Sequence, residues 1–149
     1  MIVGHIAGCI GKGLVAGLVG TAAMTLSSTI EMKLRGRSAS SAPSDAAGKV
    51  LGVQPRNAEG KARFSNVVHW SYGTAWGGIR GLIGATGMPR VAADATHFGA
   101  VWGAALITLP SLKVAPPVTE WGWEEVAIDA LHHFVYAVAT GIAYDLLDE

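Results

Sequence analysis

Seven ionisable side chains lie within stretches of the chain that are otherwise apolar, and these residues are the best placed to do chemistry. They are His69, Arg80, Asp94, His97, Asp129, His132 and His133. An isolated buried charge is unfavourable, so such groups tend to face one another, a water-filled cavity or the interior of a helix bundle. Gathered in one polar interior, they would suit a proton path, a metal site or a haem site.

Helical spacing predicts three polar faces among these residues. The first face holds His69, Trp76 and Arg80, the second Asp94 and His97, and the third Asp129, His133, Tyr136 and Thr140, with His132 beside it. We expect Arg80 and Asp94 to pair, because both flank one short connection. His97 and His133 have no evident partner, so a functional site is expected there. Mutual pairing of the polar groups is the simpler interpretation, and ligand or ion binding is the alternative.

Two cofactor hypotheses follow from the histidines. Haem b needs two histidines on different helices at similar depth, and His69 with His132 or His133 meets that requirement. Zinc has little support, because there is no HExxH motif and the adjacent His132 and His133 point in different directions. The sequence also lacks a nucleophile elbow and a nucleotide-binding glycine motif. We expect no enzyme, no metal and no required cofactor, with haem b as the alternative.

The composition favours a single all-α membrane domain as the setting of these residues. Half of the 149 residues are hydrophobic and 15% are charged, against roughly 25% in soluble proteins. Twenty glycines lie mostly in the apolar stretches, as in membrane helices that pack closely. A soluble four-helix bundle is the alternative. The formal net charge of zero gives no support for nucleic-acid binding.

Four apolar stretches are long enough to cross a bilayer as helices. They cover about residues 13–30, 64–87, 91–109 and 126–147, and Pro89 and Pro110 close the second and third. Trp121 and Trp123 precede the fourth, as interfacial anchors do. A polar segment, about residues 36–63, separates the first two stretches. Within it we expect a short helix that ends near Gly52, with Ser44 or Asp45 as N-cap.

The distribution of basic residues predicts the orientation in the membrane. Seven of them lie between the first and second stretches: Lys33, Arg35, Arg37, Lys49, Arg56, Lys61 and Arg63. Other connections carry one or none. By the positive-inside rule this segment is cytoplasmic and both termini lie outside, which indicates a multi-pass protein.

Glycines and other small residues recur every four positions in three of the stretches, a pattern known as a glycine zipper. The glycines are Gly13 and Gly17 in the first, Gly73, Gly77 and Gly81 in the second, and Gly99 and Gly103 in the third. Such strips allow helix backbones to approach closely in lipid. The partner of each strip is either another helix of this chain or another subunit.

Several segments resemble a family of small, uncharacterised bacterial inner-membrane proteins with four helices, loosely similar to YagU-type domains of unknown function. The resemblance is carried by Met24-Thr25-Leu26, Leu34 to Arg37 with Ser38, Ser41 and Pro43, His69-Trp70 with Gly73, Gly77, Arg80 and Gly81, and His132 to Tyr136 with Thr140-Gly141 and Asp145. It implies a membrane fold and a location in the bacterial cytoplasmic (inner) membrane, and it brings no activity with it. Relatives often have lysine where this chain has His133.

The sequence therefore predicts a non-enzymatic membrane protein that acts as an accessory or structural subunit or associates with itself. Its expected partners are the lipid bilayer and other membrane subunits or further copies of the chain. One alternative is a small channel or transporter whose interior is lined by His, Asp and Arg. Another is a redox subunit associated with haem or quinone.

Overall fold

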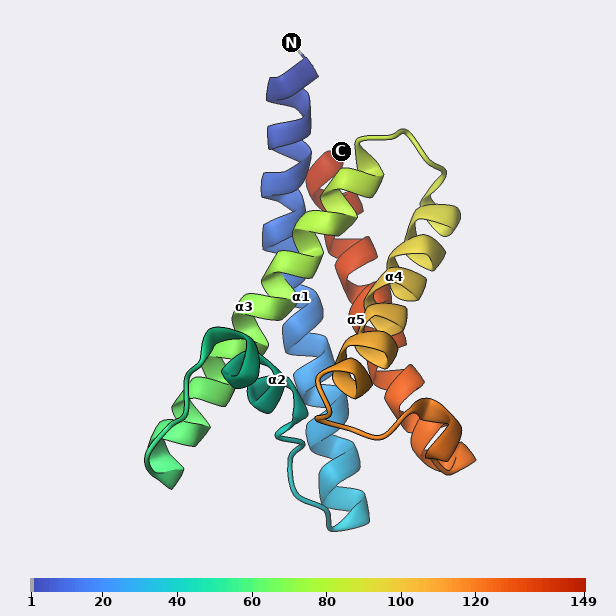
Figure 1. The fold of residues 1–149 in the computed structure, drawn as a ribbon. Helices are drawn as coiled ribbons and strands as arrows, with labels where there is room; N and C mark the ends of the chain where they lie inside the picture. The colour runs from blue at the N-terminus through green and yellow to red at the C-terminus, as the bar shows by residue number, and fades with distance from the viewer. Residues whose placement is uncertain (1) are drawn as a thin grey trace.

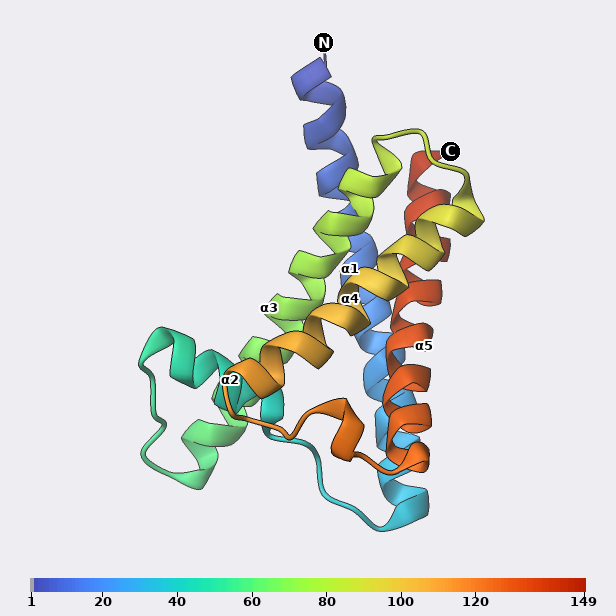
Figure 2. The ribbon, with the colours of Figure 1, turned by 45° about the vertical axis from the view of Figure 1, so that its right-hand side comes forward.

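Helices make up the whole ordered framework of the protein in a computed structural model that describes residues 2–149, among which there is no strand. The elements are α1 (Ile2–Arg35), α2 (Ala42–Leu51), α3 (Ala58–Gly84), α4 (Arg90–Ser111), the short 3-10 helix η1 (Val118–Glu120) and α5 (Trp123–Asp148). This confirms the all-α class. The four long helices alternate in direction, so both termini lie at one end of the molecule and α2 lies toward the other (Figures 1 and 2). We call these the terminal end and the α2 end.

Local signals explain where the helices begin and end. α1 stops at Gly36 and α2 at Gly52, which have φ angles of 64° and 67°, a conformation that favours glycine. The N–H of Gly52 also donates to the carbonyl of Gly48. α3 begins after Asn57, whose side chain accepts a hydrogen bond from the N–H of Gly60.

The helices extend beyond the predicted stretches. α1 starts at Ile2 rather than near residue 13, and Lys12 lies inside it without interrupting it. α4 continues past Pro110, because the N–H of Leu112 still bonds to the carbonyl of Thr108 and closes the last turn. At α2 the predicted cap was wrong. Ser41 occupies the N-cap position, and Ser44 and Asp45 lie in the first turn.

The interior of the molecule is polar and lined by small residues. α1 packs mainly against α3 and α5, and α4 packs against α5. The largest side chains that are fully buried are Arg80, His97, Thr21 and Thr140. Large aliphatic side chains instead point outward, among them Leu14, Val15, Leu18, Val19, Leu26, Ile107, Leu131, Ile142 and Leu146. This is the reverse of a soluble bundle, in which leucine, isoleucine and valine fill the core.

Two helices, α1 and α5, are long and apolar enough to cross a membrane. The stretches that the sequence predicted at residues 64–87 and 91–109 correspond to α3 and α4, which are not among these two candidate spans. Membrane crossing by α3 and α4 stays a prediction.

Candidate functional site

The most deeply buried charge of the molecule, that of Arg80, lies near the terminal end between α3, α4 and α5. Its Nε donates to Oδ1 of Asp94 over 3.0 Å, which is the ion pair expected from the sequence. Its NH2 group donates to Oδ1 of Asp145 over 3.3 Å. The guanidinium carbon also lies 4.7 Å from the ring centre of Tyr144. Two carboxylates and an aromatic face therefore hold a guanidinium that is 1% exposed.

Asp145 and Arg90 complete this cluster and were not identified as partners of Arg80 from the sequence. Nε of Arg90 lies 2.5 Å from Oδ2 of Asp145, so Asp145 bridges a buried and an exposed arginine. The alternating direction of the helices could have revealed the bridge. This alternation brings the end of α3, the start of α4 and the end of α5 to the same end of the bundle.

Two glycines make room for the cluster. A Cβ atom added to Gly141 would lie 2.2 Å from Oδ1 of Asp94, and one added to Gly84 would lie 2.4 Å from the hydroxyl of Tyr144. A neighbouring polar side chain therefore occupies the space that a side chain at Gly141 or Gly84 would need. This explains a glycine within α5 and another at the end of α3.

His97 forms the centre of the interior and is 0% exposed. Its Nε2 donates to the carbonyl of Trp76 over 3.0 Å, and its ring centre lies 5.6 Å from that of Tyr136. The Tyr136 hydroxyl donates to the carbonyl of Gly73 over 2.6 Å. His97 Nδ1 on α4 and the Thr140 hydroxyl on α5 are each buried without a hydrogen-bond partner among residues 2–149. Nε2 of His132 and the hydroxyl of Tyr144 are likewise buried without a hydrogen-bond partner among these residues.

A second polar group joins α1 to α5 toward the α2 end. Nδ1 of His132 lies 2.8 Å from the Ser27 hydroxyl, and its Nε2 lies 3.7 Å from Glu31. Glu31 also accepts hydrogen bonds from Arg37, which hold the pKa of Glu31 below the usual range of a glutamate. Arg35 links the same carboxylate to Glu124 of α5.

His132 is the more deeply buried of the two adjacent histidines of α5, whereas the sequence placed His133 on the polar face and His132 beside it. His132 is 6% exposed, whereas the His133 side chain is 13% exposed and Asp129 is 34% exposed at its side chain. Nδ1 of His133 donates to the carbonyl of Asp129 one turn earlier. Asp129 accepts a hydrogen bond from the indole of Trp102 over 2.9 Å, so both residues have local partners.

The structure does not bring His69 and His132 to a common gap. His69 Nε2 donates to the Thr25 hydroxyl over 2.8 Å, because that hydroxyl gives its own hydrogen to the carbonyl of Thr21. Thr25 and Ser27 are two residues apart on α1 and so point to roughly opposite sides of it. α1 therefore stands between the two imidazoles, and this pair does not fit a single haem iron.

The predicted glycine strips divide into two sets. Gly13 and Gly17 of α1 meet Gly77 and Gly81 of α3. A Cβ on Gly13 would lie 2.3 Å from the carbonyl oxygen of Gly77. Gly73 leaves space for the hydroxyl of Thr21 instead, 2.1 Å from the position of an added Cβ.

Gly99 and Gly103 of α4 form the other set. An added Cβ on either residue would have no atom within 4 Å among residues 2–149. The expected packing role of these two glycines therefore has no counterpart within the chain.

No grouping of three or more His, Cys, Asp or Glu side chains within residues 2–149 could hold a metal ion. The polar side chains instead link neighbouring helices in three places: the Arg80 cluster, the His97 region and the His132 group. No known protein family, curated protein or solved structure matches the chain.

Proposed function

We propose that the protein is a non-enzymatic, multi-pass protein of the bacterial cytoplasmic membrane, in which α1, α3, α4 and α5 form a glycine-packed four-helix bundle. The outward apolar surface carries this proposal. Only 22% of the most apolar stretch of α1 and 28% of that of α5 are buried within the chain. The core helix of a soluble protein would be mostly buried, so lipid or another membrane protein is needed to cover these faces.

The close approach of α1 to α3 supports the same bundle. Where Gly13 and Gly17 meet Gly77 and Gly81, a methyl group would overlap backbone atoms of the facing helix. Without a hydrophobic force between helices in lipid, such contacts and interhelical hydrogen bonds are the main source of helix association. The bonds from Tyr136 to Gly73 and from His69 to Thr25 are of this kind.

Within this setting we propose an accessory or structural role. Most interior ionisable groups are paired with one another or with backbone carbonyls, as groups that fix a helix arrangement are. α4 presents Gly99 and Gly103 on a side that the chain leaves open, where a neighbouring membrane helix would fit. The expected neighbour is a subunit of a membrane assembly or another copy of this chain.

Extraction and purification test both parts of the proposal. Membranes washed with alkaline carbonate are expected to retain the protein, and its release into the supernatant would overturn the membrane assignment. Purification in a mild detergent, followed by mass spectrometry, is expected to recover partners at fixed stoichiometry. Gly99→Leu should reduce that recovery, whereas Gly8→Leu, on an open part of α1, should not. A monomer alone in every mild detergent would contradict the accessory role.

A small proton or ion transporter is the second candidate, favoured by the unpartnered atoms of His97 and Thr140. These atoms lie between the Arg80 cluster and the His132 group and could accept a transient proton or water. Proteoliposomes with a pH-sensitive dye would report proton flux. If the protein transports protons, His97→Ala should lower the flux at least tenfold, which corresponds to a barrier higher by about 1.4 kcal/mol. Equal flux in the two proteins would exclude it.

A further inference from the structure

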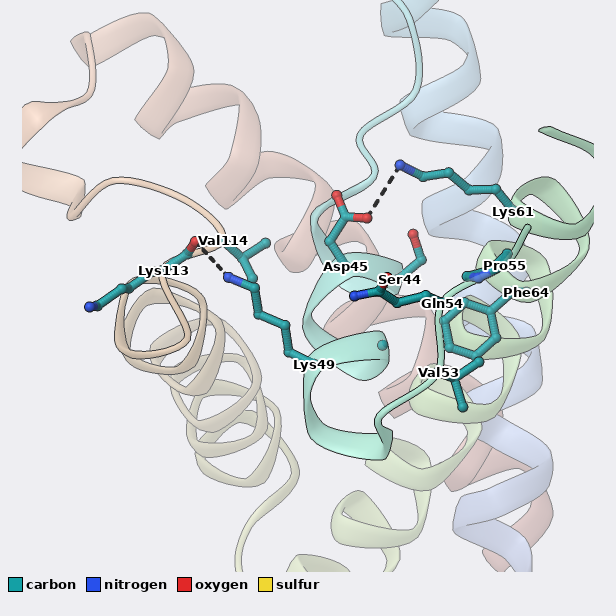
Figure 3. A pocket seen from close by; sticks show the side chains of 11 residues that line it. Ser44, Asp45, Lys49, Val53, Gln54, Pro55, Lys61, Phe64, Lys113 and Val114 are labelled. Carbon is teal, nitrogen blue, oxygen red and sulfur yellow. Dashed lines mark hydrogen bonds and ion pairs between the residues drawn. The ribbon is translucent and has the colours of Figure 1, made fainter. Parts of the chain in front are cut away.

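A hollow of about 420 Å³ opens at the α2 end and is separate from the polar interior. Three parts of the chain line it: α2 with the loop after it, the start of α3, and the connector that follows α4 (Figure 3). Its volume falls within the range of small-molecule sites. The hollow forms where residues between 44 and 64 meet the connector at Lys113 and Val114.

One part of the lining is apolar. Phe64 of α3, Val53 of the loop and Val114 of the connector contribute it. Gly48 keeps the loop close to α2, since an added Cβ would lie 2.8 Å from the carbonyl oxygen of Val53. The hollow therefore offers a hydrocarbon surface beside its polar groups, as a site for an amphipathic ligand does.

Two lysines line the hollow from different elements, Lys49 on α2 and Lys61 on α3. In Figure 3 the ammonium of Lys49 points to the connector and that of Lys61 points to Asp45. Nζ of Lys49 donates to the carbonyls of Leu112 and Lys113 over 2.8 and 3.0 Å, and Nζ of Lys61 lies 3.3 Å from Asp45. An ammonium has three N–H donors. These contacts use two N–H donors of Lys49 and one of Lys61. One donor on Lys49 and two on Lys61 remain for a ligand.

We propose that this hollow binds the phosphate of an anionic phospholipid, with Lys49 and Lys61 donating to its oxygens and Phe64 covering the glycerol part. The inference rests on the membrane location proposed above, which places the α2 end at the cytoplasmic headgroup layer. Anionic lipids of that leaflet attract basic segments. Three lysines, at 49, 61 and 113, line the hollow against one carboxylate, that of Asp45, which pairs with Lys61.

Native mass spectrometry of the full-length protein in detergent tests the proposal, with phosphatidylglycerol and phosphatidylcholine as lipid probes. We expect one phosphatidylglycerol to bind in preference to phosphatidylcholine. Lys49→Gln and Lys61→Gln should each weaken it about fivefold, because each removes a charge-assisted hydrogen bond to the phosphate. Lys33→Gln is the matched control, because Lys33 is exposed at the same end but outside the hollow. It should bind as the wild type does.

Three results would overturn the proposal: no preference for phosphatidylglycerol, equal binding by both pocket variants and the wild type, or equal weakening by Lys33→Gln. Inorganic phosphate forms a separate arm. Displacement of the lipid by millimolar phosphate that depends on Lys49 and Lys61 supports the phosphate chemistry. If the protein binds phosphate through these lysines but is released from membranes by carbonate, the membrane proposal and the lipid ligand are both wrong. The phosphate site itself would then still stand.

Discussion

At the scale of single residues, the polar interior is explained by pairing. Arg80 could be matched to Asp94 from the sequence, because the two flank one short turn and carry opposite charges. The second carboxylate, Asp145, is distant in sequence, and its contact depends on how far α5 extends beside α3. His132 and His133 are adjacent, so a rotation of α5 by one residue decides which is buried. Periodicity locates a face only to within about one residue.

Replacing Arg80 tests how far this pairing stabilises the protein. Arg80→Met removes the partner of Asp94 and one partner of Asp145 and leaves their carboxylates in a partly buried place. We expect a loss of about 3 kcal/mol in unfolding free energy, measured by denaturant titration in micelles with tryptophan fluorescence. Lys12→Met, which breaks the exposed pair with Asp148, should lose less than about 1 kcal/mol. Equal losses would show that burial adds nothing to the Arg80 pair.

At the scale of the helices, the sequence predicted the number and kind of long elements but not their partners. All four expected stretches lie largely within helices, and a short helix ends at Leu51 as expected. The glycine repeats could not show which strip faces which. Two strips of equal spacing look alike in sequence, whereas the contacts depend on the crossing of α1 over α3. Gly99 and Gly103 have the same spacing as Gly13 and Gly17, but a Cβ added to either would meet no atom within 4 Å among residues 2–149.

A pair of glycine variants separates these two kinds of position. In Gly77→Ala the new methyl would lie 2.3 Å from the carbonyl oxygen of Gly13, and helix backbones must move apart to admit it. Such overpacking costs about 1–3 kcal/mol, against a gain of about 1 kcal/mol in helix propensity. We therefore expect Gly77→Ala to lower the thermal unfolding midpoint in detergent. Gly99→Ala should leave it unchanged or raise it, and the reverse order would contradict the α1–α3 contact.

At the scale of the whole molecule, the alternating helices place the basic residues together. Residues of the 36–63 segment and Lys113 of the α4–α5 connector lie at the α2 end, while the termini and the α3–α4 turn lie at the other (Figures 1 and 2). The sequence could predict this arrangement because short turns force neighbouring helices to run in opposite directions. It could not predict the hollow at the α2 end, which forms only when residues between 44 and 64 meet the distant connector near residue 113.

Labelling of introduced cysteines measures this arrangement in the cell and tests whether α3 and α4 cross the membrane. The native Cys9 is buried and would first be replaced by alanine. Ser38→Cys and Thr119→Cys then report on the α2 end and Thr86→Cys on the α3–α4 turn, all at exposed positions. In intact spheroplasts a membrane-impermeant maleimide should label only Thr86→Cys, and permeabilisation should expose the other two. If only α1 and α5 cross, position 86 lies on the same side as 38 and 119. All three sites would then behave alike, either all labelled in intact spheroplasts or all labelled only after permeabilisation, and the four-span bundle would be wrong.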